Sequence, residues 1–440
     1  MLVLMQSVLA DVLDYSGSLR LKYEYQHVVI NDVSIFLAED INNPESNMDK
    51  NIEFCFAEDI TENIIKKKKE EFKFNILNKN LNSSIVNKKN IKKYISREKI
   101  KNYLEKKIVP LINQEQKNVI ISRDEKSNKI IFDGYGQQKI SVNIKETIDL
   151  IIFAIENNIS YVNIDVTKIE PILTVKDDEL KKIGITELVS VGRSDFSNSS
   201  WKRIKNVTNG ASKFNGYIIP DNYIFSFNEQ LGEINASTGF VPELVILGDK
   251  VIPEYGGGLC QVSSTAYRGS MLAGVEIVER HNHSYAVSYY APHGSDATIY
   301  SPTKDFKFKN TSGHALLMQT RRGGHNNNEL FYYYYGTKPK NRDVYILGPF
   351  KSNFRGALAS KVTYDSSLPE GTHKVVSHSV SGFTSRFYRI VKEDKKDLYN
   401  DIFKSIYQAR GYWEIRGGED PSKKIEETEE IEEIEKNEIS

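Results

Sequence analysis

The stretch Tyr255-Gly-Gly-Gly-Leu-Cys-Gln-Val-Ser-Ser-Thr265 places one cysteine directly behind three consecutive glycines. Glycine adopts positive φ angles at little cost, so the segment before Cys260 is predicted to be a tight turn. The apolar residues after Cys260 are spaced as on one face of a helix, and Gly274 suits the end of that helix. The stretch therefore predicts a turn followed by a helix, with Cys260 at the helix start.

Around this helix, the chain from 185 to 340 is rich in glycine and aromatic residues, and strand-like alternation dominates. Gly248-Asp249 predicts a hairpin, and the segments Val275–Arg280 and Ser284–Tyr290 are predicted to be strands. Before this region, Ser96 is a predicted helix N-cap, followed by helical and strand patterns. The predicted fold class is α+β, multidomain and mainly β in its central domain.

The chain of 440 residues is too long for one ordinary domain. We predict six segments from the shifts in composition and pattern. They are a truncated signal segment (1–20), a variable region (21–90), an α+β module (91–184), the central domain (185–340), a β-rich unit (341–417) and an acidic tail (418–440).

The first of these segments is ambiguous. Val8-Leu-Ala10 has the small residues that signal peptidase requires, but no Lys or Arg precedes the apolar run. A short buried strand or helix is the alternative interpretation. No other stretch has about eighteen consecutive apolar residues, so no internal membrane span is predicted.

Composition bears on the partners and the cysteine chemistry. Lys+Arg and Asp+Glu both number 59, so the chain has no overall basic field for nucleic acid. The two cysteines, Cys55 and Cys260, form neither a disulfide framework nor a CxxC motif. We predict no cofactor and no metal, and the sequence leaves the oligomeric state open.

The surroundings of Cys260 suit a thiol nucleophile. A helix start favours the thiolate, and a nearby histidine can act as its base. His281 and His283 would share one face of a strand, and Asp296 could orient an imidazole. Two alternatives stay open: a buried cysteine with surface histidines, and a zinc site formed by Cys260, His281 and His283.

The glycine turn also exposes backbone N–H groups that could bind an oxyanion. The predicted catalytic residues are Cys260, His283, His281 and Asp296. The predicted oxyanion or substrate-binding residues are Gly257, Gly258, Leu259, Gln261, Ser263 and Asn228.

At these residues the chain resembles the VanW family of bacterial envelope proteins, which is named from glycopeptide-resistance clusters. The resemblance covers roughly 185–336. It rests on Ser194-Asp-Phe196, Phe225-Ser-Phe-Asn228, Pro253, Gly256–Thr265, Glu279-Arg-His-Asn-His-Ser284, Asp296-Ala-Thr298 and Asp305–Asn310. The module at 91–184 looks like the peptidoglycan-binding domain that commonly precedes VanW domains, and 341–417 looks like the accessory segment that often follows them.

The resemblance implies a protein exported to the cell wall or cell surface that acts on peptidoglycan stem peptides as an atypical L,D-transpeptidase. Cys260 would attack a donor tetrapeptide, expel D-Ala and form 3–3 cross-links through a thioester. His283 is the expected base because it lies in the His-Ser pair of the family, and His281 is the reserve. The rival hypotheses are a noncatalytic peptidoglycan-binding protein and a zinc-dependent amidase or peptidase.

Overall fold

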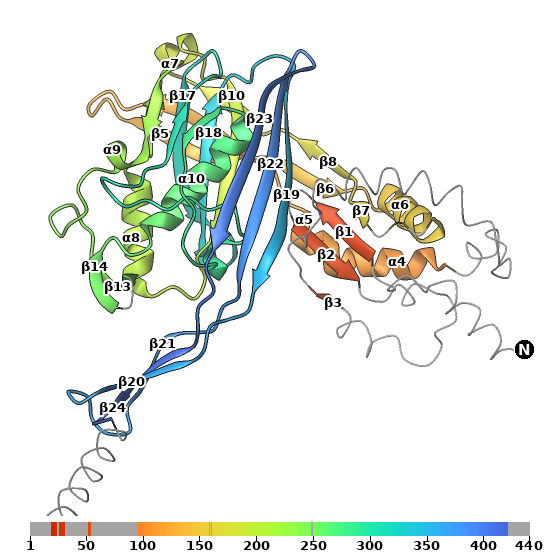
Figure 1. The fold of residues 1–440 in the computed structure, drawn as a ribbon. Helices are drawn as coiled ribbons and strands as arrows, with labels where there is room; N and C mark the ends of the chain where they lie inside the picture. Colours follow the sequence, from red (N-terminus) through yellow and green to blue (C-terminus); the bar gives the residue numbers. More distant parts are fainter. Residues whose placement is uncertain are drawn as a thin grey trace, which may run out of the picture.

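The structure is a computed structural model that describes residues 95–420 except 158, 160, 248 and 249. It also describes the backbone of three earlier strands, β1 (Leu19–Tyr23), β2 (Gln26–Ile30) and β3 (Ile52–Glu53) (Figure 1). Nearly all of the predicted signal segment, most of the variable region, Cys55 and most of the acidic tail lie outside the described residues. The predicted mixed, mainly β organisation is confirmed.

The N-terminal α+β part has its own hydrophobic core. Ser96 caps the first helix as predicted, because its hydroxyl accepts a hydrogen bond from the Lys99 N–H. Ile100, Tyr103 and Ile151 are completely buried between the helices. The elements are α4 (Arg97–Tyr103), η2 (Leu104–Ile108), α5 (Val109–Ile112), α6 (Ile144–Glu156), β6 (Lys139–Val142), β7 (Tyr161–Asn163) and β8 (Val166–Ile169).

A second group of elements from the same stretch packs on the central domain instead. It comprises β4 (Lys117–Arg123), β5 (Ile130–Gln137), β9 (Leu173–Val175) and α7 (Asp178–Lys182). Val119 and Ile121 share a core with Tyr333 and Tyr335 of the central sheet, and the Tyr335 hydroxyl accepts a hydrogen bond from the Gly136 N–H. The stretch 91–184 therefore contributes to two hydrophobic cores.

The central domain is built on a four-stranded sheet with the order β10-β18-β17-β11. Its strands are β10 (Glu187–Asp195), β18 (Glu329–Gly336), β17 (Leu316–Gly323) and β11 (Ile218–Ile219). Four consecutive tyrosines fill both faces of β18, because successive strand residues point to opposite sides. Tyr332 and Tyr334 enter the main core, whereas Tyr333 and Tyr335 face β4 and β5.

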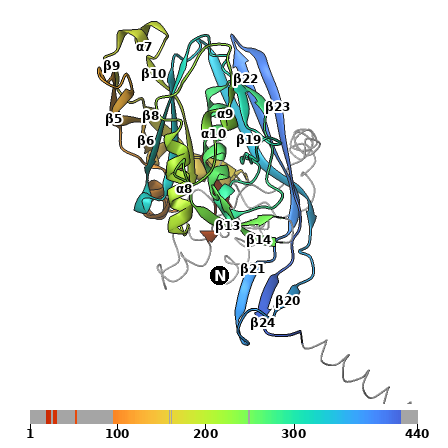
Figure 2. The same ribbon diagram turned by 90° about the vertical axis from the view of Figure 1, so that its left-hand side faces the viewer.

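The predicted helix after the glycines is α10 (Leu259–Ala273), which lies between the central sheet and the C-terminal strands (Figures 1 and 2). It packs against β10 so closely that a Cβ atom on Gly192 would lie 2.0 Å from the Thr265 carbonyl oxygen. Gly274 ends the helix in the left-handed conformation, as predicted. The close contact with β10 fixes the position of Cys260.

Short elements surround this layer. They are α8 (Trp201–Ser212), β12 (Ile224–Ser226), α9 (Phe227–Leu231), the hairpin β13 (Pro242–Leu247) and β14 (Lys250–Tyr255), β15 (Glu276–Glu279) and β16 (Lys307–Lys309). The hairpin and β15 match the predicted strands.

The predicted strand Ser284–Tyr290 is wrong: the segment is a loop that ends in the 3-10 helix η3 (Ser288–Tyr290). The buried Arg268 guanidinium donates hydrogen bonds to the carbonyls of Tyr290, Ala291 and Ser295. Because these carbonyls accept hydrogen bonds from Arg268, they do not pair with a neighbouring strand. The segment therefore forms a loop around the Arg268 side chain.

The C-terminal unit consists of strands, as expected. A long sheet has the order β19 (Arg342–Arg355), β22 (Gly382–Glu393) and β23 (Lys396–Tyr407), and a small one has the order β20 (Lys361–Asp365), β24 (Trp413–Gly417) and β21 (His373–Ser377). The long sheet lies beside α10 in both views (Figures 1 and 2). Arg389, which is completely buried, pairs with Asp401 and donates to the Val275 carbonyl. The unit thus packs directly on the central domain.

Candidate active site

The glycine turn places Cys260 in the first turn of α10. Gly256 and Gly258 have φ angles of +82° and +112°, which side chains with a Cβ rarely adopt. The N–H groups of Leu259 and Gln261 are bonded to the carbonyls of Gly256 and Gly258. The Cys260 N–H donates to no acceptor among the described residues. It therefore remains available to donate a hydrogen bond to a ligand at the positive end of the helix.

The Cys260 thiol is half-buried and has polar neighbours. Its Sγ lies 3.4 Å from Thr298 Oγ1 and 3.7 Å from the Ile299 carbonyl oxygen. Burial by itself would raise the pKa of the thiol. The neighbouring His283 imidazolium, together with Thr298, outweighs this effect and lowers the pKa to about 7. A large fraction of this thiol is therefore thiolate at neutral pH.

His283 is held in one orientation. Its Nδ1 lies 2.6 Å from Asp296 Oδ2, and its ring stacks on Tyr290 with centroids 4.0 Å apart. Its Nε2 is buried and has no hydrogen-bond partner among the described residues. Burial lowers the pKa of the imidazole, but Asp296 and then Cys260 raise it more strongly, to about 9. The ring is thus positively charged at neutral pH.

Asp296 is completely buried and accepts four hydrogen bonds. Oδ2 binds the backbone N–H and Nδ1 of His283, and Oδ1 binds Arg280 at 2.9 Å and the Tyr407 hydroxyl at 2.5 Å. Burial would raise the pKa of this carboxyl, yet the His283 hydrogen bond and the Arg280 charge hold it well below its ordinary value. Asp296 is therefore a carboxylate at every pH at which the protein would work.

The C-terminal unit contributes directly to this cluster. The Tyr407 hydroxyl from β23 also accepts a hydrogen bond from the Gly294 N–H at 2.7 Å. Ser405 Oγ accepts from Arg280 at 2.8 Å, and the Gln408 N–H donates to the Ser284 carbonyl at 2.7 Å. Sequence reasoning missed Arg280 and Tyr407. Nothing in the sequence links Tyr407 to a carboxylate 111 residues earlier.

His281 does not join the cluster. It lies in the loop after β15, and its Nε2 is 3.0 Å from Glu279 Oε1. The premise that His281 and His283 share a strand face is wrong, because β15 ends at Glu279. Among the described residues, no three His, Cys, Asp or Glu side chains converge as they would around a metal ion.

The predicted substrate-binding residues lie in different surroundings. The Gly257 carbonyl accepts a hydrogen bond from Asn206, and the Gln261 side chain is completely buried beside Cys260. Ser263 is also completely buried, and its hydroxyl donates to the Ala297 carbonyl. Asn228 donates to the Lys304 carbonyl and holds the chain before β16.

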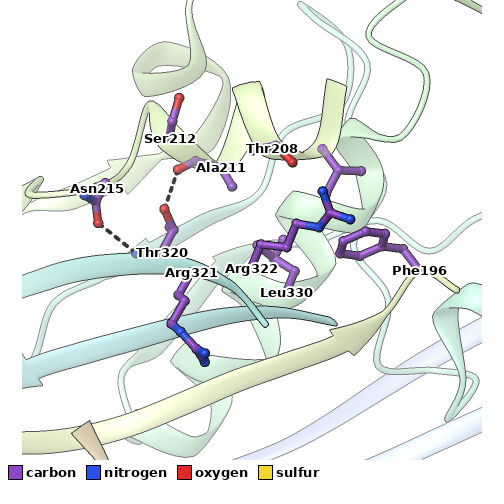
Figure 3. Close-up of a pocket in the computed structure, with 10 residues that line it drawn as sticks. Phe196, Thr208, Ala211, Ser212, Asn215, Thr320, Arg321, Arg322 and Leu330 are labelled. Carbon is purple, nitrogen blue, oxygen red and sulfur yellow. Dashed lines mark hydrogen bonds between the residues drawn. The ribbon is translucent and has the colours of Figure 1, made fainter. Parts of the chain in front are cut away.

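A separate pocket of about 140 Å³ lies between α8 and the central sheet (Figure 3). Its lining residues include Phe196, Arg321 and Arg322 but none of Cys260, His283 and Asp296. Thr320 in its wall donates from its hydroxyl to the Ala211 carbonyl and from its backbone N–H to Asn215 Oδ1 (Figure 3). The thiol site is therefore distinct from this pocket.

The site combines a cysteine at a helix start, a histidine and a buried aspartate, which are the groups that a thiol nucleophile requires. Residues 202–331, which contain all three, match the family model described as "VanW like protein". This stretch of the chain is therefore similar to the VanW domain, in agreement with the resemblance seen in the sequence.

A curated relative is the "Uncharacterized protein YoaR" of Bacillus subtilis (strain 168), which is 33% identical over 126 residues. The match covers 29% of this chain and 41% of that protein, so the chain spans less than half of the relative's length. Among solved structures, the "IgA1 Protease G5 domain structure" is 15% identical, with a TM-score of 0.12 over 18% of this chain and 94% of that one. The structure "HP0197-G5" is 17% identical, with a TM-score of 0.10 over 17% and 97%.

Among the described residues, no helix is both long and apolar enough to span a membrane.

Proposed function

We propose that this protein is a cell-envelope acyltransferase that uses Cys260 to form 3–3 cross-links between peptidoglycan stem peptides, as an L,D-transpeptidase. The observation that supports the chemistry best is the His283–Asp296 pair, with 2.6 Å between Nδ1 and Oδ2, because the neighbouring imidazolium lowers the pKa of the Cys260 thiol. With thiol and imidazole pKa values of about 7 and about 9, thiolate and imidazolium coexist between these two pH values. The peptidoglycan substrate is proposed from the match of residues 202–331 to the VanW family model.

In the first half-reaction, the Cys260 thiolate attacks the carbonyl carbon of the L,D-amide in a donor tetrapeptide. A C–S bond forms, and the available Cys260 N–H donates a hydrogen bond to the oxyanion. The His283 imidazolium then gives its Nε2 proton to the departing amine as the C–N bond breaks. The products are a thioester and D-Ala.

In the second half-reaction, the side-chain amine of an acceptor's third residue attacks the thioester. Neutral His283 takes a proton from the attacking nitrogen, the C–S bond breaks, and the thiolate leaves. The new amide is the cross-link, and the imidazolium is restored. Asp296 stays ionised throughout and accepts a hydrogen bond from the Nδ1–H of His283. The Nε2 atom is therefore the one that gives and takes protons.

The direct test is to capture the thioester. Purified full-length protein incubated with a donor tetrapeptide and quenched in acid is expected to gain the mass of the acyl group on Cys260, with release of one equivalent of D-Ala. Peptide mapping by mass spectrometry locates the adduct. D-Ala release without an adduct, at the same rate after the thiol is blocked, would refute a thioester mechanism.

Tyr407 is expected to act as a positioning residue for Asp296. In Tyr407→Phe, Asp296 loses one of its four donors, so we expect kcat to fall roughly tenfold with KM unchanged. The ring still packs on Phe383, whose centroid lies 5.1 Å away, so the fold is expected to be retained. Steady-state kinetics and thermal unfolding measure the two effects.

The matched control is Tyr399→Phe, in the same strand. The Tyr399 hydroxyl donates to Thr311 and not to Asp296, so this variant should keep the wild-type kcat. Equal loss of kcat in both variants, in proportion to loss of stability, would show that Tyr407 only supports packing of the C-terminal unit.

A further inference from the structure

Arg203 reaches from α8 to the glycine turn that precedes the nucleophile. One guanidinium nitrogen, Nη2, donates to Gln261 Oε1 at 2.9 Å. The other terminal nitrogen, Nη1, lies so close to Gly258 that a Cβ atom added there would be 2.8 Å away. A side chain at 258 would push the guanidinium aside, so glycine at this position leaves room for it. The cation therefore lies beside the residue two positions before Cys260.

The guanidinium has donors that the protein does not use. Arginine carries five N–H donors and is charged at any working pH. Among the described residues, Arg203 Nε is buried without a hydrogen-bond partner, and the side chain donates only from Nη2, to Gln261. A buried cationic donor without a partner is costly. Nη1 makes no hydrogen bond to the described residues and is not among the buried unpartnered atoms, so it is the nitrogen that a ligand can reach.

Two neighbouring tyrosines connect Arg203 with the catalytic histidine. The guanidinium carbon of Arg203 lies 4.5 Å from the Tyr289 ring centroid, and the next residue, Tyr290, stacks on His283. Stacking on Tyr289 holds the planar guanidinium in one orientation. Burial raises the pKa of the Tyr290 hydroxyl, the Cys260 charge raises it further, and the Arg203 charge lowers it. The charges of the thiol and the guanidinium thus shift the pKa of the same hydroxyl in opposite directions.

We propose that Arg203 binds a carboxylate of the acyl donor next to the Cys260 thiol. This inference deepens the proposed function and rests on it for the identity of the donor. In a donor tetrapeptide, the departing D-Ala carries a carboxylate one residue beyond the amide that Cys260 attacks. A second source is a side-chain carboxylate on the donor residue whose carbonyl forms the thioester with Cys260. Either can accept a forked pair of hydrogen bonds from a guanidinium.

A probe without peptidoglycan tests the anion site alone. Iodoacetate and iodoacetamide both alkylate a thiolate by displacing iodide, but only iodoacetate carries a carboxylate. We expect Arg203→Met to lower the rate of alkylation by iodoacetate, relative to that by iodoacetamide, roughly tenfold at Cys260. Arg203→Lys should lower this iodoacetate-to-iodoacetamide ratio less. Lys205→Met is the control, because it removes one positive charge from the exposed side of α8. A ratio that is equal in wild type and Arg203→Met would overturn the proposal.

Matched peptides then identify the carboxylate. The donor tetrapeptide is compared with one version amidated at its C-terminus and one amidated at the side-chain carboxylate. One of the two amides is expected to acylate wild-type Cys260 roughly tenfold more slowly than the acid, and Arg203→Met should abolish that difference. Equal acylation by all three peptides would refute the proposal while supporting the transpeptidase function. If no peptide acylates Cys260 but the alkylation ratio depends on Arg203, the anion site stands and the proposed donor is wrong.

Discussion

Cys260→Ala is expected to abolish 3–3 cross-linking, with a loss of at least about 10⁴-fold in the purified reaction. The variant removes the only atom that can form the thioester, and no other thiol takes part in the cluster of described residues. The side chain is half-buried and its contacts are weak, at 3.4 Å to Thr298 and 3.7 Å to the Ile299 carbonyl. Folding should therefore be nearly unaffected. Muropeptide analysis of cells that carry the variant in place of the wild-type protein measures the effect.

The control for this variant is Cys55→Ala, which removes the other cysteine of the chain. It should leave the 3–3 dimers unchanged. Persistence of the dimers in cells with Cys260→Ala would exclude the proposed activity and favour the noncatalytic binding hypothesis. In that case, sedimentation of the protein with purified peptidoglycan should be equal for wild type and Cys260→Ala.

The second large effect is expected from His283→Ala. Without the imidazolium, burial is no longer opposed by this positive charge, and the pKa of the thiol should rise from about 7 toward or above its ordinary value of 9.0. At pH 7 the thiolate fraction then falls from about one half to about one hundredth. Alkylation by iodoacetamide at pH 7 should slow by roughly 50-fold. Acyl transfer should fall further, by another factor of about 10² to 10⁴, because the acid for the departing amine is also lost.

The rate of acyl transfer is expected to depend on pH through Cys260 and His283. In wild type, the rate of acyl transfer rises as Cys260 loses its proton near pH 7 and falls as His283 loses its proton near pH 9. Asp296→Asn removes the group that most raises the pKa of His283, so the upper limit should move to lower pH. His281→Ala is the control, since His281 pairs with Glu279 outside the cluster. Identical alkylation profiles for wild type and His283→Ala would show that His283 does not activate the thiol.

Several local features follow from short stretches of sequence. Glycines at 256 and 258 and the apolar spacing after Cys260 predict the turn and α10, because both depend on neighbours along the chain. The Ser96 cap and the β13–β14 hairpin are predictable for the same reason. The candidate residues Cys260, His283 and Asp296 were also identified from sequence, and the structure brings them together.

Other features depend on contacts between distant segments. The choice between His281 and His283 is decided by Asp296, which binds both the ring and the backbone N–H of His283. The loop at 284–290 alternates like a strand, yet the buried Arg268 takes the carbonyls that follow it. Sequence periodicity carries no information about such a partner.

The sequence by itself determined that a cysteine begins a helix behind a glycine turn, because backbone conformation and helix dipole are local properties. Only the tertiary structure decided what surrounds that thiol. Tyr407 reaches Asp296 from the C-terminal sheet, and Arg203 reaches the glycine turn from α8. Both side chains are polar residues in ordinary helix and strand patterns, and their roles arise only when packing removes water and brings distant charges together.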